Sequence, residues 1–284
     1  MNSYDYIKTR QIQWAKNQGI DLIGSKVDKG APAYTQNLDH NLFEPLKTKH
    51  ETSFRTGDGG ELGGYPAKMQ PVHSSSALAV NVFQYWDSRK MVKAIAHACG
   101  LCNKATGASE SISFEVKYSI DERFPFSPNI GVVINNDKDF SYQVNAIESK
   151  FSEAYGGYGH SGLKEKYLAL DIWEDIPHLH ELATSISPED NHFKYLHAAQ
   201  LVKHILGLQR AHGKTYFRLL YLWYDALGSE GAIHRDEIVR FMEKAKEDDI
   251  AMHEISYQEI ITRLAEDYRD SDEIYIEYLT SRYL

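Results

Sequence analysis

The sequence predicts an α/β protein in which a central mixed β-sheet is flanked by α-helices. Residues 111–120, 130–134 and 143–151 are three strand candidates separated by short polar connections. Residues 215–224 form a nearly continuous apolar run, as expected of a strand buried on both faces. Strand and helix candidates then alternate as far as residue 264, which indicates that the C-terminal half adds strands to the same sheet.

The size and composition fit one globular unit. The 284 residues are 42% apolar and 25% charged, which is ordinary for a globular chain. We expect a single domain over residues 1–284 with three parts: an N-terminal extension over 1–72, core strands at about 111–151, and a C-terminal extension of the sheet over about 213–284.

The same composition narrows the function classes. No apolar run approaches the roughly 20 residues that span a bilayer, and no secretory pattern opens the chain. We therefore expect a soluble, cytoplasmic protein without a membrane partner. Two cysteines argue against a disulfide framework. The net charge of −9 argues against a broad nonspecific nucleic-acid surface, while leaving room for a local basic cleft.

The N-terminal third predicts a helix followed by irregular chain. Residues 4–18 have helical periodicity and Gly19 is a natural stop. Residues 24–60 lack clear periodicity, so we expect them to wrap the surface or cover a site. The glycine cluster over 57–64 lacks the Gly-Lys-Ser/Thr of a phosphate-binding loop. It is either a flexible turn or a bend that presents Glu61 to a cleft.

Two helices are expected before the first core strand. Ser74 or Ser75 is a suitable N-cap for a helix over 77–86, and a second helix is expected over 90–98. His73 precedes the cap, either as a structural histidine or facing a cleft. Cys99 and Cys102 close a helical run rather than open one, which argues against redox chemistry.

The first core strand alternates between apolar and polar residues. Ile112, Phe114, Val116, Tyr118 and Ile120 are expected on one face of strand 111–120. Glu115 is then on the other face, either as an ion-paired surface residue or as an acid at a cleft.

The next two strands carry the most informative residues. Side chains two apart in a strand share a face, so Glu148 and Lys150 should point the same way, with Ser149 opposite. A carboxylate can hold a hard cation, and a neighbouring ammonium can steady water or phosphate charge. Phosphodiester hydrolysis assisted by a metal needs both groups. We expect this ion pair to be exposed at the strand end.

The remaining elements are mainly helices. Helices are expected over 163–172, 179–186, 192–208, 234–246, 257–264 and 271–284, with strands over 215–224 and 250–255. The helix over 192–208 has an apolar stripe. His197, Gln200 and His204 lie on another face beside Lys203, which is either solvated or part of a site.

The core strands resemble the PD-(D/E)XK nuclease superfamily. Glu148-Ser149-Lys150 matches its Glu-x-Lys signature, and Pro128-Asn129-Ile130 matches the start of its preceding strand. The chain departs from the pattern at Gly131, where that superfamily usually has Asp. The string over 57–62 resembles an uncharacterised branch of the superfamily, and residues 195–204 resemble the helix that brings a Gln beside the Glu-x-Lys. The likeness extends loosely over nearly the whole chain.

This resemblance implies a restriction-endonuclease-like core and a DNA nuclease that uses Mg²⁺ or Mn²⁺. Metal ligands would be Glu148 and the carbonyl of Ile147, with Glu61 or Glu115 replacing the carboxylate absent at Gly131. The expected catalytic residues are Lys150, Glu148 and Gln200, and those expected to contact nucleic acid are Lys203, His204 and His73.

Two alternatives stay open from the sequence. The chain is either an inactive relative that binds nucleic acid or a protein partner, or a structural protein in which Glu148 and Lys150 only form an ion pair. Metal binding separates the nuclease from both, and nucleic-acid binding separates the two alternatives from each other.

Overall fold

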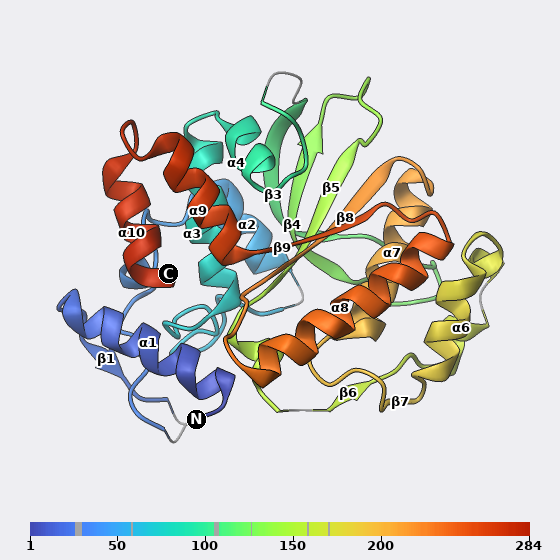
Figure 1. Ribbon diagram of the computed structural model, residues 1–284, viewed down its shortest axis with the longest axis horizontal. Helices are drawn as coiled ribbons and strands as arrows, with labels where there is room; N and C mark the ends of the chain where they lie inside the picture. Colours follow the sequence, from blue (N-terminus) through green and yellow to red (C-terminus); the bar gives the residue numbers. More distant parts are fainter. Residues whose placement is uncertain (26–29, 58, 105–107, 126, 158, 170) are drawn as a thin grey trace.

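The central element is a five-stranded mixed sheet with helices on both faces (Figure 1), as the sequence predicts. The computed structural model describes residues 1–284 except 26–29, 58, 105–107, 126, 158 and 170. The strand order is β3-β4-β5-β8-β9. Its strands are β3 (Ser109–Lys117), β4 (Asn129–Asn136), β5 (Val144–Lys150), β8 (Phe217–Trp223) and β9 (Met252–Ser256).

The sheet joins an antiparallel half to a parallel half. β3, β4 and β5 pair antiparallel, whereas β5, β8 and β9 pair parallel. β8 is therefore an interior strand, paired on both sides, and its side chains alternate between two buried layers: Leu220 and Leu222 pack on one face, and Leu219 and Tyr221 on the other.

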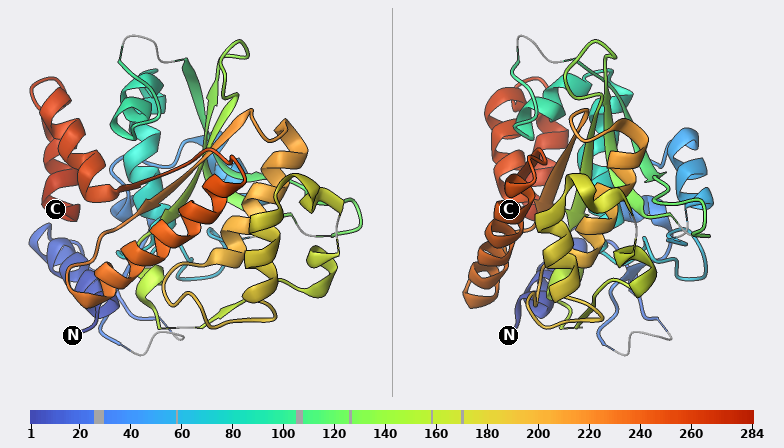
Figure 2. Two further views of the ribbon diagram at one scale, coloured as in Figure 1. Left: turned by 45° about the vertical axis from the view of Figure 1, so that its right-hand side comes forward. Right: turned by 90° about the vertical axis from the view of Figure 1, so that its right-hand side faces the viewer.

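Helices cover the two faces in separate groups (Figure 2). The first group is α1 (Ser3–Asn17), α2 (Thr48–Thr56), α3 (Ser75–Ser88), α4 (Val92–Ala98), α9 (Tyr257–Tyr268) and α10 (Glu273–Tyr283). The second group is α6 (Pro177–Ser185), α7 (Ala198–His212) and α8 (Ser229–Glu247). Among the described residues, no helix is both long and apolar enough to cross a bilayer.

Short elements connect these layers. They are β1 (Leu22–Ile23) paired with β2 (Tyr34–Thr35), β6 (His160–Ser161) paired with β7 (Glu189–Asp190), α5 (Glu165–Leu168), and the 3₁₀ turns η1 (Leu38–Asn41), η2 (Ser152–Tyr155) and η3 (Asp171–Asp175). The expected helix over 163–172 is thus only one helical turn followed by η3. Helix α2 lies within segment 24–60, for which the sequence predicts only irregular chain.

The helix expected over 192–208 begins later, at Ala198, and runs to His212. The residues before it are held in an irregular conformation by a distant carboxylate. Glu237 on α8 accepts hydrogen bonds from the backbone N–H groups of Lys194, Tyr195 and Leu196 at 2.7–2.9 Å. These donors are satisfied from outside the segment, so they do not need helical partners.

The apolar face expected for the first core strand is interrupted at Glu115. Ile112 and Phe114 pack into the first layer, but Val116 packs against the second. Glu115 has φ +52°, in the left-handed region that breaks the alternation of a strand. The prediction of one continuous face is therefore wrong beyond Phe114, because the backbone turns over at that residue.

One buried arginine of α10 ties the last helix to the N-terminal segments. Arg282 is 1% exposed. Its guanidinium donates to Gln11 Oε1 at 3.1 Å, to the backbone oxygen of Asn41 at 2.9 Å and to that of Val72 at 3.1 Å. The guanidinium also lies 4.2 Å from the ring centroid of Trp14. The packing of α1 and of the wrapping segment thus depends on α10.

Candidate active site

The sheet opens into a fork between its second and third strands. β4 and β5 pair from Asn135 opposite Val144 to Val132 opposite Ile147. Beyond that point, residues 129–131 stay paired with β3, whereas residues 148–150 stay paired with β8. The two strand ends therefore diverge, and each presents its side chains to the space between them.

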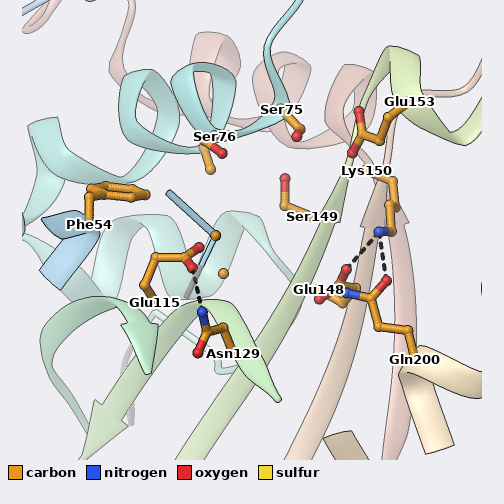
Figure 3. A pocket seen from close by; sticks show the side chains of 13 residues that line it. Phe54, Ser75, Ser76, Glu115, Asn129, Glu148, Ser149, Lys150, Glu153 and Gln200 are labelled. Atoms are coloured by element: carbon orange, nitrogen blue, oxygen red, sulfur yellow. Dashed lines mark hydrogen bonds and ion pairs between the residues drawn. The ribbon is translucent and has the colours of Figure 1, made fainter. Parts of the chain in front are cut away.

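A pocket of about 350 Å³ occupies this fork. We call it the fork pocket; Figure 3 shows the side chains that line it. It is lined by Phe54, Gly59, Ser75, Ser76, Ala79, Glu115, Asn129, Gly131, Glu148, Ser149, Lys150, Glu153 and Gln200. The lining comes from both strand ends, from the N-terminus of α3 and from the first turn of α7.

One wall of the fork pocket is a buried, hydrogen-bonded chain of charges. Lys150 Nζ lies 2.8 Å from Glu148 Oε1 and donates to Gln200 Oε1 at 2.9 Å. The other oxygen of Glu148 lies 2.9 Å from His204 Nε2. Burial opposes ionisation of Glu148, but the ammonium of Lys150 and the ring of His204 outweigh it and lower the pKa of Glu148 to about 2. Glu148 is therefore a carboxylate at neutral pH.

This pair is more buried than the sequence suggested. The side chains of Glu148 and Lys150 are only 6% and 14% exposed. The expectation of an exposed ion pair is wrong, because α7 covers this strand end and brings Gln200 and His204 onto it. Removing one partner of a buried pair costs about 3–5 kcal/mol, far more than the ~0–1 kcal/mol of a surface pair.

The opposite wall carries a second carboxylate with a different electrostatic environment. Burial, and then the negative charges of Glu61 and Glu148, raise the pKa of Glu115 to about 7. Asn129 Nδ2 donates to Glu115 Oε2 at 3.2 Å. Among the described residues, the buried Oδ1 of Asn129 has no hydrogen-bond partner. This wall thus combines an excess of negative charge with an unsatisfied oxygen.

Gly131 leaves space between the two walls. A Cβ built on Gly131 would meet no atom closer than the backbone oxygen of Ile147, at 3.9 Å. The position has no left-handed φ, so the backbone would accept a larger residue. The missing side chain widens the pocket beside the carbonyl of Ile147.

The donor set in the fork pocket fits a divalent cation of the Mg²⁺ or Mn²⁺ class. Oxygen ligands are available from Glu148, Glu115, Asn129 Oδ1 and the carbonyl of Ile147. The pKa of Glu115 is raised first by burial and then by repulsion from Glu61 and Glu148, and a cation would relieve that repulsion. Within the described ranges, no group of three or more His, Cys, Asp or Glu side chains is close enough to form a ligand cluster. A cation would therefore depend on amide, backbone and water oxygens as well.

The structure gathers most of the residues singled out from the sequence. Glu148, Lys150, Gln200 and Glu115 line the fork pocket. Glu61 does not line it, but its Oε2 accepts a hydrogen bond at 2.8 Å from Ser76, which does. Glu61 is therefore at the rim, close enough to raise the pKa of Glu115.

The three residues expected to contact nucleic acid lie in three different parts of the structure. Lys203 lines a different pocket, described below. His204 is 1% exposed and bonded to Glu148, so it has no surface to offer, and that expectation is wrong. His73 is 8% exposed and its ring lies edge-on to Tyr4, with Nε2 3.2 Å from the hydroxyl of Tyr4. We correct His73 to a packing residue.

Sequence reasoning missed Asn129, Ser76 and Glu153 in the pocket lining. The signal for Asn129 was present, because it stands two residues before Gly131 and strand alternation places both on one side. Ser76 follows the helix cap, and no sequence pattern links it to a strand 70 residues later.

A family model described as "Restriction Endonuclease associating with ARP" matches residues 8–284. No curated protein and no solved structure matches the chain.

Proposed function

Since the chain belongs to this restriction-endonuclease family, we propose that it is a divalent-metal-dependent DNA nuclease whose active site is the fork pocket. The observation that supports it most is the buried Glu148–Lys150 pair facing Glu115 across the strand fork. In this reaction water adds across one P–O ester bond of DNA, so that the hydroxyl goes to phosphorus and the proton to the leaving oxygen.

Each residue has a distinct task in this proposal. Glu148, ionised at neutral pH, holds the cation together with the carbonyl of Ile147. Lys150 is fixed by Glu148 and Gln200 and donates to the attacking water or to a phosphate oxygen. Glu115 on β3 and Asn129 on β4 would complete the oxygen ligands from the opposite wall. When bound, the cation supplies charge neutralisation at phosphate and a more acidic water.

The test replaces the buried pair without leaving a lone charge. Glu148→Gln combined with Lys150→Met removes both charges and keeps the side-chain volumes, since removal of Lys150 alone would strand a buried carboxylate. The matched control is Asp267→Asn with Lys104→Met, which removes a surface ion pair of 2.6 Å outside the pocket. Cleavage of plasmid and linear DNA is measured with Mg²⁺ and Mn²⁺, and Mn²⁺ binding by calorimetry.

We expect wild type and control to bind Mn²⁺ and cleave DNA, and the pocket variant to lose cleavage by orders of magnitude at an unchanged melting temperature. Cleavage by a folded pocket variant at the wild-type rate would refute the assignment of the active site.

One observation favours a second candidate, an inactive relative that binds nucleic acid or a protein. Gly131 offers no ligand, and both oxygens of Glu148 are already engaged by Lys150 and His204. The family description also names association with ARP, so a protein partner belongs to this candidate. Absence of Mn²⁺ binding in a folded wild type would favour it over the nuclease.

A further inference from the structure

A second pocket, lined by lysines, lies next to the fork pocket along α7. It has a volume of about 440 Å³ and we call it the lysine pocket. It is lined by Gly159, His160, Ser161, Gly162, Lys164, Lys166, Tyr167, His197 and Lys203. None of these described lining residues is a carboxylate, although the chain has 40 Asp and Glu residues and only 31 Lys and Arg residues. Positive charge is therefore concentrated at this pocket, although the net charge of the chain is −9.

Three lysines of the pocket lack an acidic partner among the described residues. Lys164, Lys166 and Lys203 form no ion pair there. Lys166 Nζ lies 4.4 Å from the ring centroid of Phe124, and Lys203 Nζ lies 5.6 Å from that of Tyr167. Burial, together with the charges of Lys164 and Lys166, lowers the pKa of Lys203. An anion in this pocket would relieve that repulsion.

Neutral polar groups complete the lining. The rings of His160 and His197 stack with centroids 4.7 Å apart. Burial, and then the charge of Lys150, lowers the pKa of His197 to about 4, so that ring is neutral at pH 7. The buried Nε2 of His160 has no hydrogen-bond partner among the described residues. These rings and the Ser161 hydroxyl offer hydrogen bonds to anion oxygens beside the lysines, a donor set that suits phosphate.

α7 fixes the spacing between the two pockets. Gln200 lines the fork pocket, and His197 and Lys203, three residues to either side, line the lysine pocket. Residues three apart on a helix have Cβ atoms about 5–6 Å apart. Successive nucleotides of one strand rise by about 3.4 Å along the helix axis, so phosphates one or two nucleotides apart suit groups at this separation.

We propose that the lysine pocket binds a phosphate group of the same nucleic-acid strand whose neighbouring phosphodiester occupies the fork pocket. This inference rests on the proposed function. It assigns to Lys164, Lys166 and Lys203 the positioning of the strand, and to α7 the register between the anchored phosphate and Lys150.

Binding is measured without metal, so that the result does not depend on activity. Fluorescence anisotropy of short labelled single-stranded and duplex DNA in EDTA is recorded between about 50 and 300 mM KCl. The variants are Lys164→Gln/Lys166→Gln and Lys203→Met, the latter keeping the apolar stem over Tyr167. The matched control is Lys244→Gln/Lys246→Gln, which removes two lysines from α8 away from the pocket. Lys203→Arg tests rescue by charge.

Each phosphate contact contributes a slope of about 0.9 to the dependence of log Kd on log salt for duplex, and about 0.7 for single strands. We expect each lost lysine contact to flatten the slope by about that amount and to weaken binding about fivefold near 0.15 M salt. The control should keep the wild-type slope, and Lys203→Arg should restore it. Wild-type slopes in both Lys164→Gln/Lys166→Gln and Lys203→Met, or no DNA binding by the wild type, would overturn the inference.

Comparing DNA strands with and without a 5′-phosphate shows whether the bound phosphate is terminal or internal. Tighter binding of a 5′-phosphorylated strand than of a 5′-hydroxyl strand, lost in Lys203→Met, places a terminal phosphate in the pocket. Equal binding of the two strands, weakened equally by Lys203→Met, places an internal phosphodiester there. Either result supports the inference.

The outcome is separable from that of the proposed function. If the lysine-pocket variants bind and cleave DNA normally while Glu148→Gln/Lys150→Met is inactive, the nuclease assignment is supported and the phosphate site in the lysine pocket is refuted. If they bind weakly and no form cleaves, the nuclease fails and the phosphate site stands.

Discussion

Gly131→Asp tests whether the fork pocket is an incomplete metal site. The new Cβ would sit 3.9 Å from the carbonyl oxygen of Ile147 without a clash, and the backbone conformation suits any residue. The added carboxylate would face the pocket between Glu115 and Glu148. It supplies the acid that the resemblance to PD-(D/E)XK nucleases leads one to expect at this strand position.

The expected gain follows from the geometry. A unit charge about 4 Å from another contributes up to about 4 kcal/mol at an effective dielectric constant of about 20. Desolvation and repulsion from Glu115 and Glu148 oppose this, so we expect a net gain of about 1.4 kcal/mol, which is about tenfold in the Kd for Mn²⁺. Without metal, the same repulsion should lower the melting temperature of the variant and raise the pKa of Glu115 further.

Calorimetric titration of Mn²⁺ into wild type and Gly131→Asp measures the gain, with DNA cleavage followed in parallel. Gly24→Asp is the control, because a Cβ at Gly24 also meets no atom within 4 Å, and Gly24 lines neither the fork pocket nor the lysine pocket. Tighter binding with new cleavage would identify the wild type as a degenerate nuclease. Strong wild-type binding that Asp leaves unchanged would mean that Glu115 or Glu61 already fills the place, and no binding by either protein would refute the metal site.

Three further predictions concern the residues around the pocket. Glu115 has a pKa of about 7 against an ordinary 4.5, so the folded state holds this proton more tightly and loses stability as pH rises through 4.5–7. In EDTA, the free energy of unfolding of Glu115→Gln, measured with urea, should therefore exceed that of wild type by about 1–3 kcal/mol at pH 8 but by little at pH 4.5. A difference that does not change with pH would contradict the raised pKa. His204→Ala should weaken Mn²⁺ binding about 10–100-fold because Glu148 loses the ring that orients its carboxylate, with His204→Gln restoring part of it; unchanged affinity would remove His204 from the site. Glu237→Ala should cost about 2–4 kcal/mol in urea unfolding, since three backbone donors lose their acceptor, whereas exposed Glu243→Ala on the same helix should cost under ~0.5 kcal/mol; equal losses would refute the role of Glu237.

The fold was readable from the sequence because its signals are local. Alternation in β3, the apolar run of β8 and the Ser74 cap of α3 each depend on residues within one element. The pairing of Glu148 with Lys150 follows from the same strand period. These features needed no knowledge of what packs against them.

Most of these errors arise from distant contacts, and one arises from a local backbone conformation. The late start of α7 depends on Glu237, some 40 residues further along the chain. The turnover of β3 at Glu115 depends on a backbone conformation that no residue pattern announces. The expectation that His204 contacts nucleic acid is wrong because its partner, Glu148, lies on another element. Burial of the ion pair was missed for the same reason.

The contacts of Arg282 have a consequence for synthesis of the chain. This side chain binds Gln11, Asn41 and Val72, all made more than 200 residues earlier. On a ribosome, those N-terminal segments would emerge long before the residue that fastens them. Until α10 leaves the exit tunnel, these segments lack their hydrogen bonds to Arg282, and the ring of Trp14 lacks its contact with the guanidinium. We therefore expect the N-terminal third to stay incompletely packed during translation and to be bound by chaperones.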